Sequence, residues 1–501
     1  MITDQREGCC DVGPGARLVR ARRVPPGQAG PDAAWDQPWD VAVLGGGNAA
    51  LVSALTAADN GARVLLLERA PAVFRGGNSR HTRNVRCAHE AADGYVTGPY
   101  PSAELRRDLD GVGTGPSNEA LADLTIAESR SVPGWMSAHG ARWQPALRGT
   151  LGLARTNRFF LGGGKALVNS YYRTAQRAGI TVRYEACVQG LEWDASGGTC
   201  TAVIVDTPGG TRRVTARAVI AASGGFEANI DWLSRYWGDA ARNYHVRGPR
   251  YNDGTVLDLL LRGGAERAGE ERGFHAVAVD ARSPKFDGGI ATRLDSIPFG
   301  IVVNADGRRF YDEGEDIWPK RYAIWGGNIA GQPGQIAYAL WDARVHGLFL
   351  PPMYGAYRDD TLAGLSRRLG LDPRAVAVTV DGFNAAVDKR PGGGFNMAEK
   401  DGRRTEGIDP PKSNWAQRVD TPPFYGVPMR PGITFTYLGV AVTGQARVRT
   451  ADGGTFANVF AAGEIMSGNI LSSGYLAGFG MTIGTVWGRI AGREAARHAP
   501  G

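Results

Sequence analysis

The chain has 501 residues, of which 43% are hydrophobic and 21% are charged, and its formal net charge is +7. A hydrophobic fraction of this size can fill a large core, so the composition excludes a wholly disordered chain. The length predicts roughly two to four domains, or one large domain with an insertion. No run of five basic residues occurs, which argues against a tail that binds nucleic acid.

Arginine and glycine are both in excess. Only six of the 57 basic residues are lysine, which leaves 51 arginines. Two explanations stay open: a GC-rich genome that encodes arginine in place of lysine, or a surplus of guanidinium groups for anionic cofactor and substrate groups. The 72 glycines follow no collagen repeat, and they indicate many positions where the backbone turns tightly or approaches a ligand.

Cysteine usage and the N-terminal segment bear on the compartment. The five cysteines are an odd number without a C-x-x-C pair, which argues against a disulfide framework and a structural zinc site. No apolar stretch approaches the ~20 residues of a membrane span. Residues 1–39 lack the apolar segment of a signal peptide. We expect a cytoplasmic protein without a metal site, with residues 1–37 as a disordered tail.

The first ordered segment predicts a strand, a glycine-rich loop, a helix and a second strand. The apolar run 41–44 precedes the sequence GGGNAA at 45–50. A helix is predicted over 51–58 and a second buried strand over 63–67, which ends at Glu68. The pattern G-x-G-x-x-A between a strand and a helix, followed by an acid 23 residues after Gly45, is typical of dinucleotide binding.

Each residue of this pattern has a physical role. Gly45 permits the tight turn, and Gly47 lets backbone N–H groups approach a pyrophosphate. Ala50 is small enough for the helix to pack on the sheet, and the helix N-terminus carries partial positive charge toward the phosphates. Glu68 lies where an acid accepts hydrogen bonds from ribose hydroxyls. A glycine-rich turn without a ligand is the alternative.

Predicted helices and strands alternate along the rest of the chain. Its last segment again reads as a strand, a glycine-rich loop and a helix. The region 255–430 has no clear periodicity. The predicted elements are helices over 118–138, 165–178 and 478–496, strands over 181–184 and 218–222, and a hairpin of 201–206 with 213–218.

Several motifs in a fixed order resemble the flavoprotein family of fumarate reductases and succinate dehydrogenases. They are the first β-α-β unit, RGGNS at 75–79, ASGGF at 222–226, VNADGRRF at 303–310, and AGE at 462–464 before a final helix. Within the family, the strings at 75–86, 155–165, 308–325 and 434–439 are most similar to the tricarballylate dehydrogenase branch.

The resemblance implies an α/β fold with a Rossmann-type, glutathione-reductase-like FAD-binding domain. This domain would comprise residues 38–270 and 430–501. An α+β capping domain would be inserted over 271–429. In the family, such a cap is mobile and closes over the substrate. Closure excludes water from a site of hydride transfer. An ordinary second domain without motion is the alternative.

The resemblance also implies which residues hold FAD. The adenosine end would lie on the glycine-rich loop and Glu68, and Glu464 would contact the ribityl chain. The N-terminus of the last helix would point at the pyrimidine edge of the flavin. The expected FAD-binding residues are Gly45, Gly47, Asn48, Ala49, Ala50, Glu68, Arg69, Gly76, Gly77, Asn78, Ser79, Ser223, Gly224, Gly463, Glu464, Ser472, Ser473 and Gly478.

The type of flavin attachment depends on the alignment of one short motif. Membrane succinate dehydrogenases carry S-H-T with a covalently bound His, and residues 80–82 are Arg-His-Thr. Counting from Gly76-Gly77 places Asn78 at the His position, as in soluble fumarate reductases. We therefore expect non-covalent FAD.

The expected substrate residues depart from the fumarate reductase pattern. Phe435 stands at the position of a carboxylate-binding histidine, and Tyr475 is nearest to a missing arginine. Counting back from the VNADGRRF motif places Thr292-Arg293 where the family has Thr-Glu. An arginine there can hold a carboxylate in a bidentate manner, which favours a substrate with an additional or displaced carboxylate; a surface arginine is the alternative. Tyr437 is the fourth expected substrate residue.

The catalytic residues follow from the same resemblance. The family's proton carrier is an arginine after R-F-x-x-E, so Arg321 is the first candidate and Lys320 the second. Asp312, Glu313, Glu315 and Asp316 could relay the proton. His275 matches a histidine at the entry to the family's cap, and Tyr475 is the fourth candidate.

The predicted function is an FAD-dependent dehydrogenase that desaturates a di- or tricarboxylate such as tricarballylate. Three alternatives stay open. The first is a desaturase like the 3-ketosteroid dehydrogenases, because GYLAG at 474–478 resembles their S-Y-P-G-P-G motif. The others are a fumarate-reductase-like enzyme running in the reductive direction and a flavin-free binding module. The chain has no C-x-x-C-H haem motif and no iron–sulfur cysteine set, so electrons would leave to a separate acceptor, such as a membrane iron–sulfur protein or a quinone.

Overall fold

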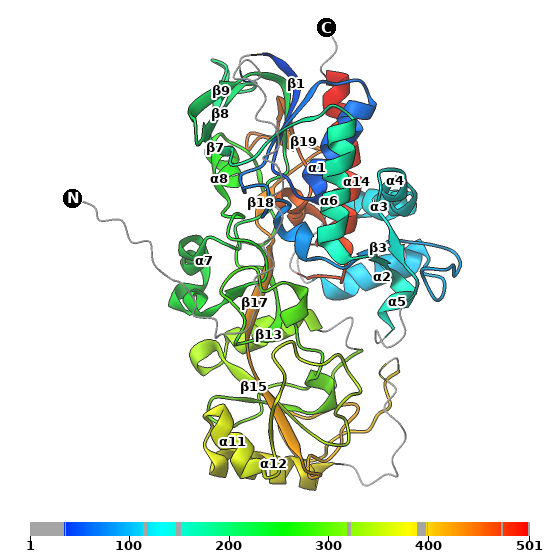
Figure 1. Cartoon of the computed structure of the whole chain (residues 1–501), viewed down its shortest axis with the longest axis vertical. Coiled ribbons are helices and arrows are strands. Elements are labelled where there is room, and N and C mark those ends of the chain that lie inside the picture. The colour runs from blue at the N-terminus through cyan, green and yellow to red at the C-terminus, as the bar shows by residue number, and fades with distance from the viewer. Residues whose placement is uncertain are drawn as a thin grey trace, which may run out of the picture.

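The computed structural model forms two lobes joined along a long strand (Figure 1). It describes residues 35, 37–113, 118–146, 152–317, 322–387, 397, 399–471 and 474–498. The expected disordered tail over 1–37 lies almost wholly outside these residues.

The upper lobe is built on a six-stranded sheet in the order β19-β20-β10-β1-β2-β6. All neighbouring pairs are parallel except β19 with β20. The strands β1, β2 and β10 are buried on both faces, as in a sheet covered by helices. The expected Rossmann-type fold is confirmed. The strands are β1 (Trp39–Leu44), β2 (Val64–Leu67), β6 (Thr181–Arg183), β10 (Ala216–Ala221), β19 (Arg447–Arg449) and β20 (Thr455–Ala461).

The first and last helices of the upper lobe pack closely on each other. These are α1 (Asn48–Asp59) and α14 (Phe479–His498). Gly484, Gly488 and Gly492 recur every fourth residue, so they share one face of α14. A Cβ atom at any of them would meet backbone or side-chain atoms of α1. The final helix therefore lies against the helix that follows the glycine-rich loop.

Two sequence predictions in this lobe are wrong in detail. The predicted helix 118–138 is two helices, α3 (Glu119–Ser129) and α4 (Val132–Ala138), because Pro133 lacks the N–H that would continue the first helix. The predicted hairpin forms, but its second strand is β9 (Gly210–Val214) rather than 213–218, and β8 (Cys200–Thr207) also pairs with β7 (Cys187–Trp193).

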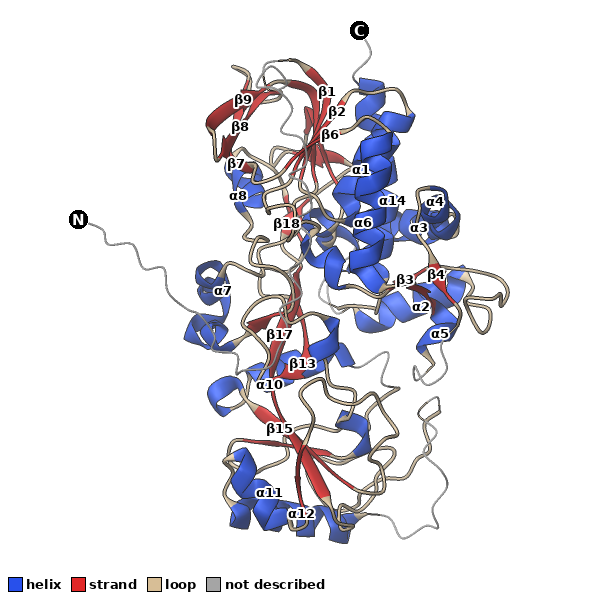
Figure 2. Cartoon of the chain, in the orientation of Figure 1, coloured by secondary structure: helices blue, strands red, loops and turns tan. Residues whose placement is uncertain are grey.

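The lower lobe contains a second six-stranded sheet organised around β17 (Phe424–Thr436). The sequence has no strand pattern here, since Pro428 and Pro431 lie inside β17 and prolines are rare within strands. β17 crosses residue 430, where the predicted capping domain ends, so both lobes share this strand (Figure 2). Its partners are β11 (His245–Val246), β13 (Phe274–Asp280), β15 (Ala337–Asp342) and β16 (Tyr357–Asp359), and β14 (Ile301–Asn304) pairs with β15.

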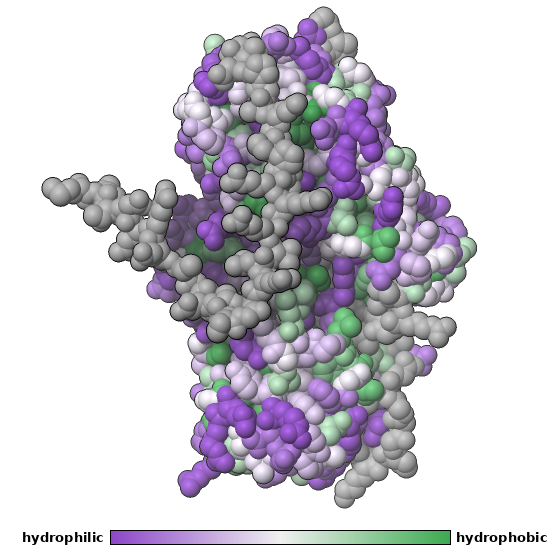
Figure 3. Space-filling model, viewed as in Figure 1, coloured by the Kyte–Doolittle hydropathy of each residue, from purple (hydrophilic) through white to green (hydrophobic). Residues whose placement is uncertain are grey.

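The remaining elements flank these two sheets. No helix among the described residues is long and apolar enough to cross a membrane, and hydrophilic and apolar side chains are interspersed on the face drawn in Figure 3. The other helices are α2 (Ser102–Val112), α5 (Leu153–Thr156), α6 (Gly163–Arg177), α7 (Ile230–Trp237), α8 (Thr255–Arg262), α10 (Trp325–Ala330), α11 (Leu362–Leu369), α12 (Pro373–Ala386) and α13 (Gly468–Leu471), and the other strands are β3 (Asn84–Arg86), β4 (Trp143–Gln144), β5 (Asn157–Phe160), β12 (Arg267–Ala268) and β18 (Gly439–Val440).

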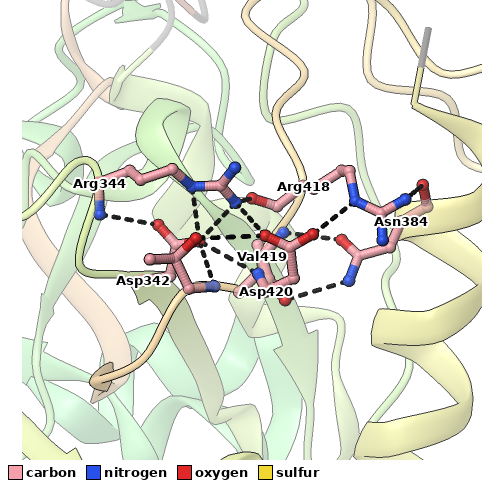
Figure 4. A network of polar contacts seen from close by, with 7 residues as sticks. Asp342, Arg344, Asn384, Arg418, Val419 and Asp420 are labelled. Carbon is pink, nitrogen blue, oxygen red and sulfur yellow. Dashed lines mark hydrogen bonds and ion pairs between the residues drawn. The ribbon is translucent and has the colours of Figure 1, made fainter. Parts of the chain in front are cut away.

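A polar network ties β15 to a distant loop of the lower lobe (Figure 4). Asp342 ends β15 and is 2% exposed. Its carboxylate accepts hydrogen bonds from the Arg344 guanidinium and from the backbone N–H groups of Asp420 and Thr421. Arg344 also pairs with the Asp420 carboxylate. The network holds the loop before β17 against the end of β15.

Candidate functional site

One long cavity begins at the carboxyl ends of the parallel strands and reaches the C-terminal end of β17. Ligands of open α/β sheets bind at this edge. Residues of both lobes line it, from Gly45 and Glu68 at one end to His275, Arg293 and Phe435 at the other.

The glycine-rich loop forms a narrow backbone cradle. Gly45 has a φ of +124°, and its N–H donates to the carbonyl oxygen of Leu67 at 2.8 Å. A Cβ atom at Gly45 would meet the backbone of Ala222, and one at Gly46 would meet the Glu68 carboxylate. The turn therefore tolerates only glycine at these positions, and backbone atoms form this part of the cavity wall.

The N-terminus of α1 faces this cavity. Gly47 is its N-cap in an extended conformation, and no side chain caps the helix. The Asn48 N–H donates to Ser79 Oγ at 2.9 Å, while the buried Asn48 Oδ1 has no partner. Asn48 and Ala49 line the cavity. An uncapped helix start with a positive partial charge is suited to hold a phosphate group.

Glu68 follows β2 at the same edge. Its side chain is 5% exposed, and its carboxylate accepts the N–H groups of Ala70 at 2.9 Å and Gly76 at 3.0 Å. Burial raises the pKa of Glu68, while these backbone donors lower it. The carboxylate is thus fixed in orientation at the cavity wall, where it can accept hydrogen bonds from a ribose.

The middle of the cavity is lined by the other expected FAD-binding residues. Two buried oxygens in this part, Asn48 Oδ1 and Asn78 Oδ1, lack a hydrogen-bond partner. Together with the glycine cradle and the uncapped helix, they fit a dinucleotide with a polar ribityl chain. The expected residues that line the cavity here are Arg69, Gly77, Asn78, Ser79, Ser223, Gly224, Gly463, Glu464 and Gly478.

Some expected site residues lie elsewhere. Ala50 and Gly76 do not line the cavity: Ala50 is buried within α1, and Gly76 donates its N–H to Glu68. Thr292 does not line the cavity either, and its hydroxyl donates to the Gly289 carbonyl oxygen at 3.0 Å. Tyr437 is buried behind Phe435, with ring centroids 5.8 Å apart. Lys320, Arg321, Ser472 and Ser473 fall outside the described residues.

Three arginines from different segments gather at the other end of the cavity: Arg83, Arg247 and Arg293. Arg293 forms a salt bridge of 2.7 Å with Asp295 and lies over the ring of Tyr322, 4.8 Å from its centroid. Among the described residues, no carboxylate forms a salt bridge with Arg83 or Arg247. Arg247 donates to Thr434 Oγ1 at 3.1 Å, and the Nε atoms of Arg83 and Arg247 are buried without a partner.

The three arginines carry like charges that repel one another. Burial, followed by the charge of Arg293, lowers the pKa of both Arg83 and Arg247 to about 10. Both guanidinium groups therefore stay protonated at neutral pH. Three cations against the single carboxylate of Asp295 leave two positive charges that no protein anion among the described residues balances at this site. Buried charges of this kind are costly unless a counter-ion binds.

An aromatic wall faces the arginines. The ring of His275, from β13, stacks on Tyr475 at a centroid distance of 4.0 Å and an interplanar angle of 7°. Phe435 lies 5.4 Å from Tyr475. Burial and the charges of Arg247 and Arg293 hold the pKa of His275 well below its usual range, so the imidazole is neutral. Its Nδ1 is buried without a partner.

Sequence reasoning missed Arg83, Arg247 and Tyr322. Arg83 lies inside the string RGGNSRHTRNVR, which contributed to the resemblance only as a motif. Arg247 is in HVRGPRYNDG, a segment without a recognised pattern. A count of arginines close to the glycine motifs is the one signal that could have drawn attention to them.

Comparison with known proteins shows the family to which the chain belongs. An FAD binding domain model matches residues 40–478. The fold, the cavity and this match define the class as a protein with an FAD-binding domain. The chain belongs to the FAD binding domain family, since the match covers most of its length.

Among curated proteins, the chain is 27% identical to an NADH:fumarate oxidoreductase of Klebsiella pneumoniae, over 100% of this chain and 52% of that protein. It thus spans about half the length of this relative. It is also 25% identical to a fumarate reductase (cytochrome) of Shewanella frigidimarina, over 92% of this chain and 77% of the relative.

Two solved structures share the fold. One is the open conformation of a flavocytochrome c3 fumarate reductase, with a TM-score of 0.73 and 23% identity over 94% of this chain and 80% of that one. The other is a 3-ketosteroid Δ1-dehydrogenase of Sterolibacterium denitrificans, with a TM-score of 0.72 and 18% identity over 92% and 99%.

Proposed function

We propose that the chain is an FAD-dependent dehydrogenase that removes hydride and a proton from adjacent carbons of a small di- or tricarboxylate, such as tricarballylate. The product is a C=C bond conjugated to a carboxylate. The observation that carries this proposal concerns Arg83 and Arg247: their Nε atoms are buried without a partner, and no carboxylate among the described residues forms a salt bridge with either arginine. A guanidinium can hold a carboxylate with two parallel hydrogen bonds, and a substrate with several carboxylates would balance both charges.

The cavity residues suggest how the reaction would proceed. FAD would occupy the end at Gly45 and Glu68 and accept a hydride. The arginines would bind the substrate carboxylates, and they would stabilise the negative charge that develops next to a carboxylate when the α-proton leaves. The neutral His275 can accept a hydrogen bond at Nδ1. Arg321, with Lys320 as the second candidate, remains the predicted proton acceptor. The predicted cap over 271–429 would close on the substrate and exclude water.

A separate acceptor would then take the electrons, such as a membrane iron–sulfur protein or a quinone. We also propose that the flavin is not covalently bound, because Asn78 stands at the position of the covalent histidine. Precipitation of the protein with acid should release all yellow colour into the supernatant. A coloured, washed pellet would show a covalent bond instead.

A second candidate is a desaturase of 3-ketosteroid type, and one observation favours it. The Tyr475 ring stacks on His275 and lies against Phe435, and its hydroxyl lies beside Gly480 near the start of α14. A phenol held in this way could polarise a ketone. Arg83 and Arg247, which form no salt bridge with a carboxylate of the described residues, weigh against a neutral, apolar substrate, because such a substrate would bring no counter-ion to them.

The test is a dye-coupled oxidation screen of the flavin-loaded protein. Tricarballylate, succinate, citrate analogues and ketosteroids are the substrates, and reduction of the corresponding unsaturated acids is measured with a reduced dye. We expect oxidation of tricarballylate or another carboxylate with at least two carboxyl groups. Turnover of ketosteroids alone would overturn the proposal in favour of the second candidate, and faster reduction than oxidation would reverse the direction.

A further inference from the structure

Two acidic side chains meet behind the middle of the cavity. Glu227 lies in the loop after β10 and is 0% exposed. Glu464 begins the short 3-10 helix that follows β20, and its exposed part faces the cavity that it lines. Both carboxyl groups lie over Gly225, where a Cβ atom would collide with an oxygen of each. An oxygen of each carboxyl therefore lies next to the same backbone position.

If both carboxyls were ionised, one of their buried oxygens would have no hydrogen-bond donor among the described residues. Glu227 Oε1 accepts from the amides of Asn78 and Asn252, the latter at 2.8 Å. Glu464 Oε1 accepts from the Thr436 N–H at 3.0 Å. Glu227 Oε2 is buried without a hydrogen-bond donor, and it approaches the same backbone position, Gly225, as Glu464 Oε1 does. Ionised carboxylates are acceptors only, so a hydrogen bond between these two carboxyls requires a proton on one of them.

No cation within the part of the chain that the structure describes compensates for the pair. Among the described residues, no lysine, arginine or histidine forms a salt bridge with Glu227 or Glu464. The titratable side chains that face Glu464, besides Glu227, are Tyr437 and Tyr475. Burial is the main cause that raises the pKa of each glutamate, and the charge of Glu227 raises that of Glu464 further. Two adjacent negative charges cannot persist in such a place.

We propose that Glu227 is a positioning residue that shares a single proton with Glu464, so that the pair carries one negative charge at neutral pH. The shared proton holds the Glu464 carboxyl in one orientation at the middle of the cavity. From there, its other oxygen can accept a hydrogen bond from a bound polar chain. The inference concerns this chain's own residues and does not depend on which substrate is oxidised.

Infrared spectroscopy tests the shared proton directly. The carbonyl stretch of a protonated carboxylic acid is separate from the bands of ionised carboxylates and shifts in D₂O. We expect this band at pH 7 in the wild type, with and without flavin, and its loss in Glu227→Gln and Glu464→Gln. In Glu227→Gln, the new side-chain amide would donate to the Glu464 carboxylate in place of the shared proton, so this variant should fold.

Glu313 provides a matched control. It is also buried, at 3% exposed, but Arg309 rather than a second carboxyl pairs with it. Glu313→Gln should leave the band in place. A band that persists in both Glu227→Gln and Glu464→Gln would overturn the proposal, and so would its absence from the wild type.

Unfolding provides a second measurement that does not use activity. Unfolded glutamates ionise near pH 4.5, whereas the folded pair keeps its proton to higher pH. Unfolding the wild type at pH 6 should therefore release about one proton more than unfolding Glu227→Gln. Between pH 5 and 6.5, the unfolding equilibrium constant of the wild type should rise with pH by up to about tenfold per unit more steeply than that of the variant. Equal slopes would overturn the proposal.

Discussion

His275 and Tyr475 lie parallel to each other across the end of the cavity, with ring centroids 4.0 Å apart. His275 belongs to β13, which pairs with β17, while Tyr475 precedes α14. The stack therefore connects the sheet of the lower lobe to the helix that packs on the dinucleotide loop. A neutral imidazole suits this contact, since it lies near two arginines whose charges disfavour its protonation.

Arg247→Gln should weaken the use of carboxylate substrates. Loss of one charge-assisted hydrogen bond costs roughly 1.5–3 kcal/mol, so kcat/KM for a tricarboxylate should fall about 10- to 100-fold. Arg83→Gln should act in the same direction. Steady-state kinetics with a dye acceptor measures both variants, and the flavin absorbance verifies that each still binds the cofactor.

Arg449→Gln is the control for this pair. Arg449 pairs with Glu266 at 2.6 Å on a partly exposed surface, and it does not line the cavity. Its loss should leave kcat/KM within about twofold, as expected for a surface ion pair. If Arg83→Gln and Arg247→Gln behaved like this control, the arginines would have no part in substrate binding.

Glu68→Gln should lower the flavin content of the purified protein. The amide keeps one acceptor oxygen, but its NH₂ group would face the backbone N–H of Ala70 or Gly76, which donates to the carboxylate in the wild type. The ribose hydroxyls would lose one acceptor oxygen. The ratio of flavin to protein absorbance measures occupancy, and Glu266→Gln, on the surface, should leave it unchanged. Full occupancy in Glu68→Gln would contradict the assignment of this end of the cavity to adenosine.

The dinucleotide end of the site could be predicted from the sequence because its requirements are local. Gly45, Gly47 and Glu68 belong to one β-α-β unit, and the spacing of a strand, a turn and a helix fixes where each lies. The substrate end depends on long-range folding instead. Arg83 and Arg247 are 164 residues apart, and only the packing of the two lobes brings both to one cavity.

Arg293 illustrates why residue type alone was insufficient. The sequence predicts it as a cation for a substrate carboxylate, and the structure places it at the cavity. Asp295, two residues later, already forms a salt bridge with it, and this pairing depends on how the chain turns after the 3-10 helix Ile290–Thr292. The lower sheet was missed for a similar reason, since β17 is held by its neighbours on both edges despite its prolines.

Asp342→Asn should destabilise the lower lobe. The asparagine would turn an NH₂ group toward the Arg344 guanidinium or toward the N–H groups of Asp420 and Thr421. Because Arg344 is partly exposed, water would screen the loss, and we expect a decrease of about 1–3 kcal/mol in the free energy of unfolding. Denaturant unfolding measures it. Asp360→Asn removes an exposed pair with Arg358 and should cost less than about 1 kcal/mol; equal effects would show that the network of Figure 4 contributes no more than a surface pair.

Gly488→Ala should loosen the contact between α14 and α1, and with it the dinucleotide loop. A Cβ atom at Gly488 would lie 2.9 Å from the Ala49 carbonyl oxygen and 2.9 Å from Val52 Cβ, so the two helices would have to move apart. Overpacking of this kind costs about 1–3 kcal/mol. Gly382→Ala in α12 is the matched control, because nothing lies within 4 Å of a Cβ there, and alanine favours a helix by roughly 0.5–1 kcal/mol. The thermal midpoint and flavin occupancy should fall in Gly488→Ala, while Gly382→Ala should keep or raise its midpoint. Similar midpoints for the two variants would mean that the close approach of the helices does not support the cofactor site.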